Sequence, residues 1–249
     1  MSTFRVIARV TAGLAILAGV AIGGLMAYEL WGTSMHTRAA QSSLERDWDE
    51  QAAGSERAKT PAMDPSSEGQ EDTGGSRAAG PVIHGRDPAV RDTALEAASV
   101  DVRDAPAVGD AVLRIDMVRP ETGERVVLDE PLVVVEGVGA AELALGPGRY
   151  EHTVMPGQPG TAAIAGHRVT YGAPFNRLDE LAVDDEIHVT DLDGQEHVYR
   201  MVEQQIVRPE DTWVLDDPLD SSGATLVLTT CHPKYSQRER LVVFAELVG

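Results

Sequence analysis

The sequence contains one cysteine, Cys231, a residue type that can act as a nucleophile. It follows the β-branched run 225–230 and precedes His232-Pro233, where the strand pattern ends. A thiol at the end of a strand, on the rim of a barrel, is exposed enough to react. Taken alone, the residue type leaves a small buried core thiol as an alternative.

A thiol nucleophile needs a partner that exchanges a proton with it or with the substrate. His167 follows Gly166 at the end of the apolar segment 161–166, which is a second strand-end position. His232 adjoins Cys231, but neighbouring strand residues point to opposite faces, so we expect His232 to face away. The remaining histidines lie in the N-terminal region, in a loop or within strand patterns: His36, His84, His152, His188 and His197. His167 is therefore the leading candidate.

An oxyanion formed by attack on a carbonyl needs a hydrogen-bond donor. Arg238 and Arg240 open the last strand, which we expect to pair with or lie near the Cys231 strand through a short connection. A guanidinium supplies fixed, permanently charged donors. Either arginine could instead be an ordinary surface charge, and residue type alone does not separate the two.

Charge and cysteine content exclude several classes of function. The 249 residues carry 21 Lys and Arg against 40 Asp and Glu, a formal charge of −19. A chain this acidic has no broad attraction to nucleic acid, so we expect no nucleic-acid partner. A single cysteine excludes an internal disulfide, and a zinc site of His167, Cys231 and His232 lacks any recognised ligand spacing. We therefore expect neither a metal nor a cofactor.

The elements that must position these residues are short strands. From Ala111 to the C-terminus, alternating and β-branched runs indicate about eight strands and little helix. The runs cover 112–118, 125–128, 132–135, 161–166, 186–190, 197–202, 225–230 and 240–248. Closing such strands into a barrel removes exposed edges, which predicts an all-β barrel domain over 107–249.

The N-terminal part has a different character. Residues 10–28 are nineteen uncharged, mostly apolar residues behind two arginines. A helix of this length spans roughly 28 Å, close to the ~30 Å core of a bilayer. The flanking charges predict a cytoplasmic N-terminus, a transmembrane anchor over 1–31 and an extracytoplasmic remainder. The alternative is a cleaved signal peptide, for which residues 25–27 form a poor cleavage site.

Residues 32–106 lack a sustained hydrophobic period and are rich in Ala, Ser, Gly, Asp, Glu and Pro. This composition predicts a flexible, acidic, extracytoplasmic tether, with a weakly helical stretch near 38–51 as the local exception. Because the tether contains no nucleophile, we expect residues 1–104 to be dispensable for the chemistry.

Three segments together resemble the sortase family, the membrane-anchored cysteine transpeptidases of Gram-positive bacteria. Residues 228–231 (LTTC) are similar to the family's cysteine signature, and residues 164–168 (IAGHR) to its histidine motif. Residues 240–245 (RLVVFA) resemble its closing strand, with an arginine five residues before an alanine. The likeness covers 105–249 in sequence and 1–104 in architecture only. It is greatest to the class E sortases of high-GC actinobacteria, with class D the nearest alternative.

The resemblance implies an eight-stranded sortase β-barrel with short helices. It also implies Cys231 as nucleophile, His167 as general acid/base and Arg240 as the arginine that stabilises the oxyanion or positions substrate. Arg238 falls two residues early and is interpreted as a surface charge. The implied partners are surface proteins with an LPXTG- or LAXTG-like sorting signal.

The implied reaction cleaves that signal between Thr and Gly. It then joins the protein, through a thioester, to an amine of a peptidoglycan precursor at the plasma membrane of a Gram-positive bacterium. Two alternatives remain open: a pilin-polymerising sortase that uses a pilin lysine, and a non-enzymatic anchored β-barrel that binds a partner.

Overall fold

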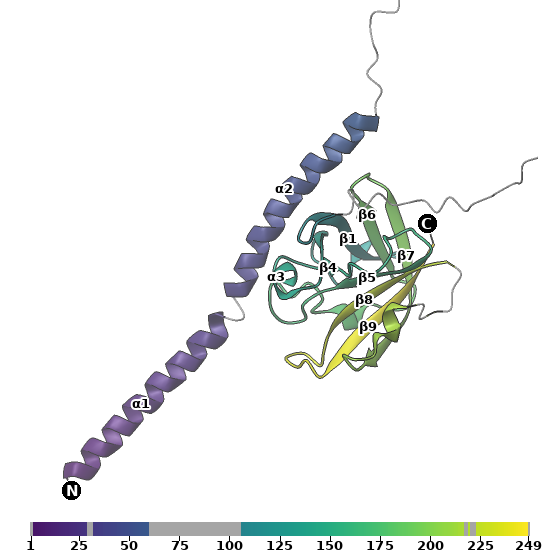
Figure 1. The fold of residues 1–249 in the computed structure, drawn as a ribbon. Helices are drawn as coiled ribbons and strands as arrows, with labels where there is room; N and C mark the ends of the chain where they lie inside the picture. The colour runs from purple at the N-terminus through teal and green to yellow at the C-terminus, as the bar shows by residue number, and fades with distance from the viewer. Residues whose placement is uncertain (1, 29–31, 60–105, 217–218, 220–222, 249) are drawn as a thin grey trace, which may run out of the picture. The chain divides into compact units, whose positions relative to one another are not determined.

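The structure is a computed structural model that describes residues 2–28, 32–59, 106–216, 219 and 223–248 (Figure 1). The N-terminal part contains two helices, α1 (Ser2–Ala27) and α2 (Thr33–Lys59). In the part of the chain that the structure describes, no helix is both long enough and apolar enough to cross a membrane.

The structure has a helix over 33–59, where the composition favours a flexible tether; residues 60–105 lie outside the described residues. One face of α2 is buried, through side chains three or four positions apart: Thr33, Thr37, Gln41, Leu44 and Trp48. Three of these five residues are polar, so the face leaves almost no hydrophobic period in the sequence. Helix α2 forms because its side chains make hydrogen bonds and apolar contacts with the barrel, and not because its sequence has a high helix propensity.

The strands of the described chain form one nine-stranded sheet in the order β2-β1-β3-β4-β5-β8-β9-β7-β6. Pairing of β1 with β6 closes this sheet into a barrel. Its strands are β1 (Ala111–Arg119), β2 (Glu124–Arg125), β3 (Leu132–Glu136), β4 (Gly148–Arg149), β5 (Gly160–Ala165), β6 (Glu186–Asp191), β7 (Glu196–Val207), β8 (Ala224–His232) and β9 (Glu239–Leu247). The short helices are α3 (Ala140–Leu143), η2 (Leu178–Glu180) and η3 (Thr212–Leu215). The predicted all-β barrel is confirmed.

The strand count differs from the predicted eight. The additional strand is β4, whose two residues are too short to leave a period-two pattern, and the predicted run 125–128 overlaps β2 only at Arg125. β2 pairs with β1 at a tight turn, and β4 bridges β3 and β5.

Three strands in the middle of this order carry the candidate residues. β5 runs parallel to β8, and β9 runs antiparallel to β8 on its other side. In Figure 1, β8 and β9 lie side by side at the green-to-yellow end of the chain. The parallel β5–β8 pair brings two strand ends, about 65 residues apart in the chain, to the same edge.

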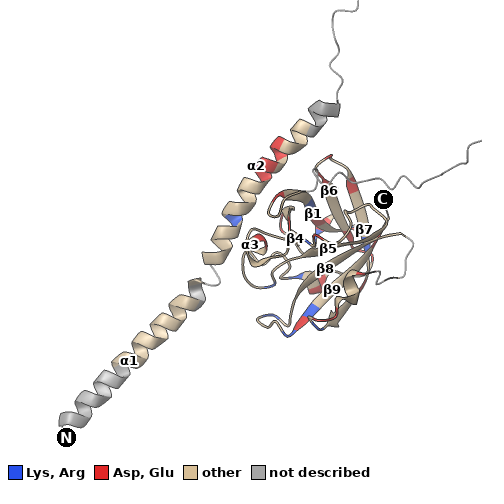
Figure 2. Ribbon diagram, viewed as in Figure 1, with Lys and Arg blue, Asp and Glu red and all other residues tan. Residues whose placement is uncertain are grey.

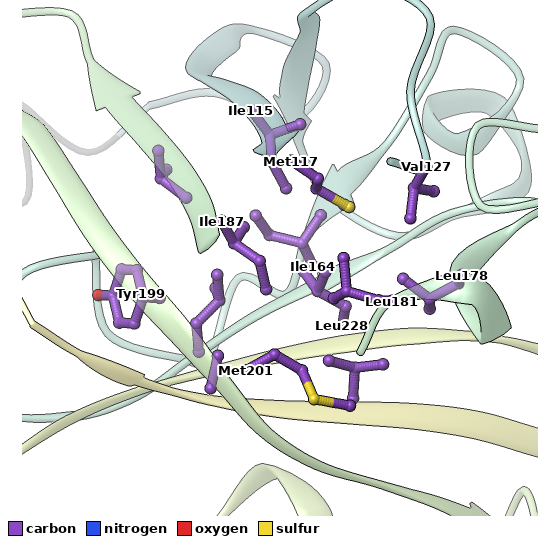
Figure 3. Packing of buried hydrophobic residues seen from close by; sticks show 14 of the residues in the cluster. Ile115, Met117, Val127, Ile164, Leu178, Leu181, Ile187, Tyr199, Met201 and Leu228 are labelled. Atoms are coloured by element: carbon purple, nitrogen blue, oxygen red, sulfur yellow. The ribbon is translucent and has the colours of Figure 1, made fainter. Parts of the chain in front are cut away.

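The two faces of these strands pack differently. Leu226 and Leu228 of β8 belong to the main core cluster inside the barrel, where Figure 3 shows Leu228 among Ile164 and Leu181. Val227, between them, belongs to a second cluster on the other face, with Phe244 and with Val214 of η3. The alternation therefore puts Cys231 on the outer face of the barrel wall, in line with Val227.

Candidate active site

The fold brings the three predicted residues into one row at the same end of the sheet. Cys231 is paired directly with Arg240 across the antiparallel β8–β9 ladder. On the other side, Ala165 pairs with Thr229, and the Gly166 N–H donates to the Thr229 carbonyl at 3.0 Å. β5 ends at Ala165, and His167 lies two residues further along, in the loop that follows this strand end.

Adjacent strands lie about 4.8 Å apart. Arg240 therefore flanks Cys231 from β9, on the same outer face, and His167 follows the end of β5 on the other side of β8. A thiol with an imidazole on one side and a guanidinium on the other has the parts of nucleophilic acyl transfer.

His167 is held by the loop that follows it. The Thr170 hydroxyl lies 3.3 Å from the imidazole Nδ1, and the Tyr171 ring lies over the imidazole with centroids 4.9 Å apart. Burial disfavours the charged imidazole and lowers the pKa of His167 below its usual value of 6.5. The site therefore keeps this histidine mainly neutral at neutral pH.

Gly166 lets the chain turn close to the core just before His167. A Cβ built there would lie 2.6 Å from Cδ2 of Phe175, a buried side chain. Phe175 in turn donates its backbone N–H to the His167 carbonyl at 3.1 Å. The close approach of the two segments thus requires glycine at this position.

Arg168, the last residue of the histidine motif, links the histidine loop to the cysteine strand β8. It is 3% exposed. Its Nη2 lies 2.9 Å from the Asp179 carboxylate, and its Nε donates to the Asn176 carbonyl at 3.2 Å. Nη1 reaches the Cys231 carbonyl at 3.4 Å. One buried guanidinium therefore holds the backbones of both candidate catalytic residues.

Arg240 is half-buried, and its Nη1 donates to the carbonyls of Gln237 and Glu239 at 3.1 and 3.0 Å. These bonds hold the guanidinium beside the β8–β9 turn, next to Cys231. Arg238 is exposed in that turn, before β9 begins. Figure 2 shows basic and acidic segments adjoining at this end of β9.

The other histidines lie away from this row. His232 follows Cys231 on the opposite face, as predicted, and its Nδ1 is buried without a hydrogen-bond partner among the described residues. His188 and His197 lie in the β6–β7 hairpin beside acidic residues, and His152 is exposed in a loop. His36 is on α2, and His84 lies outside the described residues.

The outer face of β8 continues from Cys231 into a mostly apolar, buried cluster that η3 covers. The Thr229 hydroxyl lies 3.0 Å from the Tyr150 hydroxyl, and Val227 packs with Phe244. Trp213 of η3 stacks on Phe244 with ring centroids 6.2 Å apart. No sequence signal pointed to Tyr150 or Trp213, because both lie in segments without a motif.

Within the described part of the chain, no three or more His, Cys, Asp or Glu side chains come together as metal ligands would. The buried Asp185, in the acidic run 184–186, accepts two hydrogen bonds from Arg119 and one from the Ala182 N–H.

Comparison with known proteins identifies this barrel. The model of the sortase domain matches residues 126–248, which include Cys231, His167 and Arg240. The chain belongs to the sortase family. Sortase D of Bacillus subtilis is 34% identical over 121 residues, 46% of this chain and 58% of that protein. Sortase SrtE1 of Streptomyces coelicolor is 30% identical over 135 residues, 49% of this chain and 38% of that protein.

The solved structure of the SrtF sortase from Corynebacterium diphtheriae shares the fold. It has a TM-score of 0.52 and 29% identity, and the match covers 58% of this chain and 87% of that one. The chain spans less than two thirds of the length of each of these two curated relatives. The segment that matches the sortase domain is the barrel.

Proposed function

We propose that this sortase is a cysteine transpeptidase that cleaves an LPXTG- or LAXTG-like sorting signal between Thr and Gly. It then transfers the protein to an amine of a peptidoglycan precursor. The observation that carries the proposal is the cross-strand pair of Cys231 and Arg240, with His167 two residues past the end of the neighbouring strand β5. Family membership and the relatives named sortase D and sortase SrtE1 support it.

In this mechanism the Cys231 thiolate attacks the carbonyl carbon of the threonine. The C–S bond forms and the C–N bond to glycine breaks, while protonated His167 gives its proton to the leaving amine. The acceptor amine then attacks the thioester, the C–S bond breaks, and His167 takes the proton that the amine loses.

The charge of the tetrahedral intermediate needs a donor beside Cys231. Arg240, paired with Cys231 in the ladder, is placed to donate to the oxyanion or to hold the substrate carbonyl. Because burial lowers the pKa of His167, its protonated form is a minority species near neutral pH. The proposed reaction proceeds through that minority.

We assign the threonine end of the sorting signal to the end of β8, beside the half-buried Cys231. Further back on the same face of β8, Thr229 and Val227 are at most 5% exposed, and Val227 packs with Phe244 and with Val214 of η3. The peptide therefore meets the barrel at the strand end and does not run along the buried part of β8.

We further propose that α1 is the membrane anchor and that the barrel is extracytoplasmic. The support is the nineteen-residue uncharged run in the sequence, together with exposed apolar side chains along α1: Leu14, Ile16, Leu17, Val20, Ile22 and Leu25. Figure 2 shows no charged residue over the described middle of α1. Fractionation of cells that express the full chain tests this: the proposal predicts extraction by detergent and not by alkaline carbonate.

A peptide panel tests the reaction itself. The full chain in detergent is incubated with LPXTG and LAXTG variants and with an amine-bearing peptidoglycan stem peptide, and products are identified by mass. We expect cleavage after threonine and a new amide to the stem-peptide amine. Transfer only to a lysine side chain of a pilin-type protein would instead indicate a polymerising sortase. No cleavage of any variant would contradict the proposal.

A further inference from the structure

We propose that α2 is part of the catalytic unit and that Thr33, Thr37 and Gln41 position His167 by holding the loop 170–174. The inference rests on the proposed role of His167 in proton transfer. It concerns residues that lie far before the sortase-domain match in the sequence.

Gln41 fixes the helix to the barrel through its side-chain amide. Its Nε2 donates to the carbonyls of Val133 and Leu145, each at 3.0 Å, and its Oε1 accepts the Val133 N–H at 3.0 Å. The amide thus bonds both backbone groups of Val133, as a neighbouring strand would. A Cβ built on Gly146 would lie 2.2 Å from Nε2, so the barrel has glycine where this amide enters.

Thr37 and Thr33 extend the contact toward the active site. The Thr37 hydroxyl donates to the Ala144 carbonyl at 2.9 Å, and a Cβ built on Gly172 would lie 3.2 Å from the Thr37 methyl group. The Thr33 hydroxyl accepts the backbone N–H of Tyr171 at 3.2 Å. Two side chains of α2 therefore contact consecutive residues of the histidine loop.

That loop has a backbone that needs such support. Tyr171, Gly172 and Ala173 have φ angles of 51°, 73° and 48°, so three consecutive residues are left-handed. Two of them carry a Cβ, and side chains in this region cost free energy unless their surroundings hold them. The Tyr171 N–H bond to Thr33 is one of the contacts that hold this conformation.

The same loop sets the surroundings of the imidazole. Thr170 contacts Nδ1, and the Tyr171 ring covers one side of the His167 ring. Tyr171, Thr37 and Gln41 also line one cavity of about 370 Å³ between α2 and the barrel. If α2 were released, the loop could relax and Tyr171 could move off His167. The proposal departs from the expectation that residues 1–104 are dispensable for the chemistry.

The test uses the full chain in detergent with three variants. Gln41→Ala removes the three hydrogen bonds of the Gln41 amide to the barrel. Thr33→Val removes the hydroxyl that receives the Tyr171 N–H. Arg46→Ala, on the exposed side of α2, is the matched control. The titration of the His167 imidazole is followed by NMR, assigned by its loss in His167→Gln. The pH profile of kcat/KM on a sorting peptide is measured alongside.

We expect the titration midpoint of His167 to rise toward about 6.5 in Gln41→Ala and Thr33→Val, because water replaces the Tyr171 ring. Among the titratable or charged groups around His167, Tyr171 contacts its ring and the buried Arg168 follows it in the chain, while Cys231 and Arg240 lie at the same end of the sheet. None of these residues is changed in the variants. We expect kcat/KM to fall about 10- to 100-fold, as a misplaced proton carrier predicts. Arg46→Ala should match wild type in both readouts.

A Gln41→Ala or Thr33→Val protein that folds, and keeps the wild-type midpoint and pH profile, would overturn the proposal. Thr33→Val keeps the test decisive if Gln41→Ala fails to fold. If wild type cleaves no peptide while the midpoint still rises in the variants, the proposed function fails and the positioning role of α2 stands.

Discussion

Arg168 gives the sharpest test of how the histidine and cysteine segments are held together. Arg168→Met removes the charge and keeps much of the side-chain volume. The change loses the ion pair with Asp179 and the bonds to the carbonyls of Asn176 and Cys231. The matched control is Arg177→Met, whose ion pairs with Asp129 and Glu180 are solvent-exposed.

The magnitude follows from burial. A hydrogen bond to a charged group contributes about 1.5–3 kcal/mol, and a buried carbonyl left unpaired costs about 1–3 kcal/mol. Relief of the desolvation of a 3%-exposed guanidinium offsets part of this loss. We therefore expect Arg168→Met to lower the free energy of unfolding by about 3 kcal/mol, or Tm by roughly 6–12 °C. Arg177→Met loses its exposed ion pairs and one hydrogen bond to the Val127 carbonyl, so it should cost about 1–2 kcal/mol.

The assay is urea unfolding of the full chain in detergent, followed by circular dichroism, with the alkylation rate of Cys231 measured in the native state. Arg168→Met should also change the alkylation rate, because the Cys231 carbonyl loses its donor. If the two methionine variants differed in stability by less than about 1 kcal/mol, the reasoning about Arg168 would be refuted.

Three further predictions concern the row of active-site residues. Gly166→Ala should lower the free energy of unfolding by about 1–3 kcal/mol in urea, because its Cβ overlaps the Phe175 ring; wild-type stability would show that the two segments can separate freely. Arg240→Ala should lower kcat/KM about 10²–10³-fold, and Arg238→Ala should lower it far less, in assays of folded variants. A larger loss in Arg238→Ala would show that Arg240 is not the arginine that acts on the substrate. Burial lowers the pKa of His167 in the native state, so the imidazole is protonated at a higher pH in the unfolded chain than in the folded one. The free energy of unfolding therefore decreases as the pH falls below about 6.5. His167→Gln should remove this part of the pH dependence of unfolding, and an unchanged pH dependence would show that His167 is not buried as described.

The sequence predicted those features that a short local pattern controls. Period-two alternation located the long strands, and parity alone put His232 on the face away from Cys231. Strand alternation did not distinguish Arg238 from Arg240, because residues two positions apart point to the same face. The start of β9 at Glu239 separates them, because it leaves Arg238 in the turn.

The features that the sequence did not reveal depend on contacts between distant segments. The buried face of α2 includes polar residues such as Gln41, whose partners lie about 92 residues further along the chain. The positive φ angles of Tyr171 and Ala173 leave no trace in residue type, since neither residue favours that region. Arg168 stood in the motif, but only the fold shows that its guanidinium reaches the Cys231 carbonyl.

The central claim is that Cys231 forms a thioester with the sorting signal. The most direct measurement is intact-protein mass spectrometry of the full chain after brief incubation with an LAXTG or LPXTG peptide, without an acceptor amine. Wild type should gain the mass of the peptide up to threonine, and hydroxylamine should remove it. Cys231→Ala should gain no mass and release no glycine fragment. Adduct or turnover above a trace in Cys231→Ala would contradict the account.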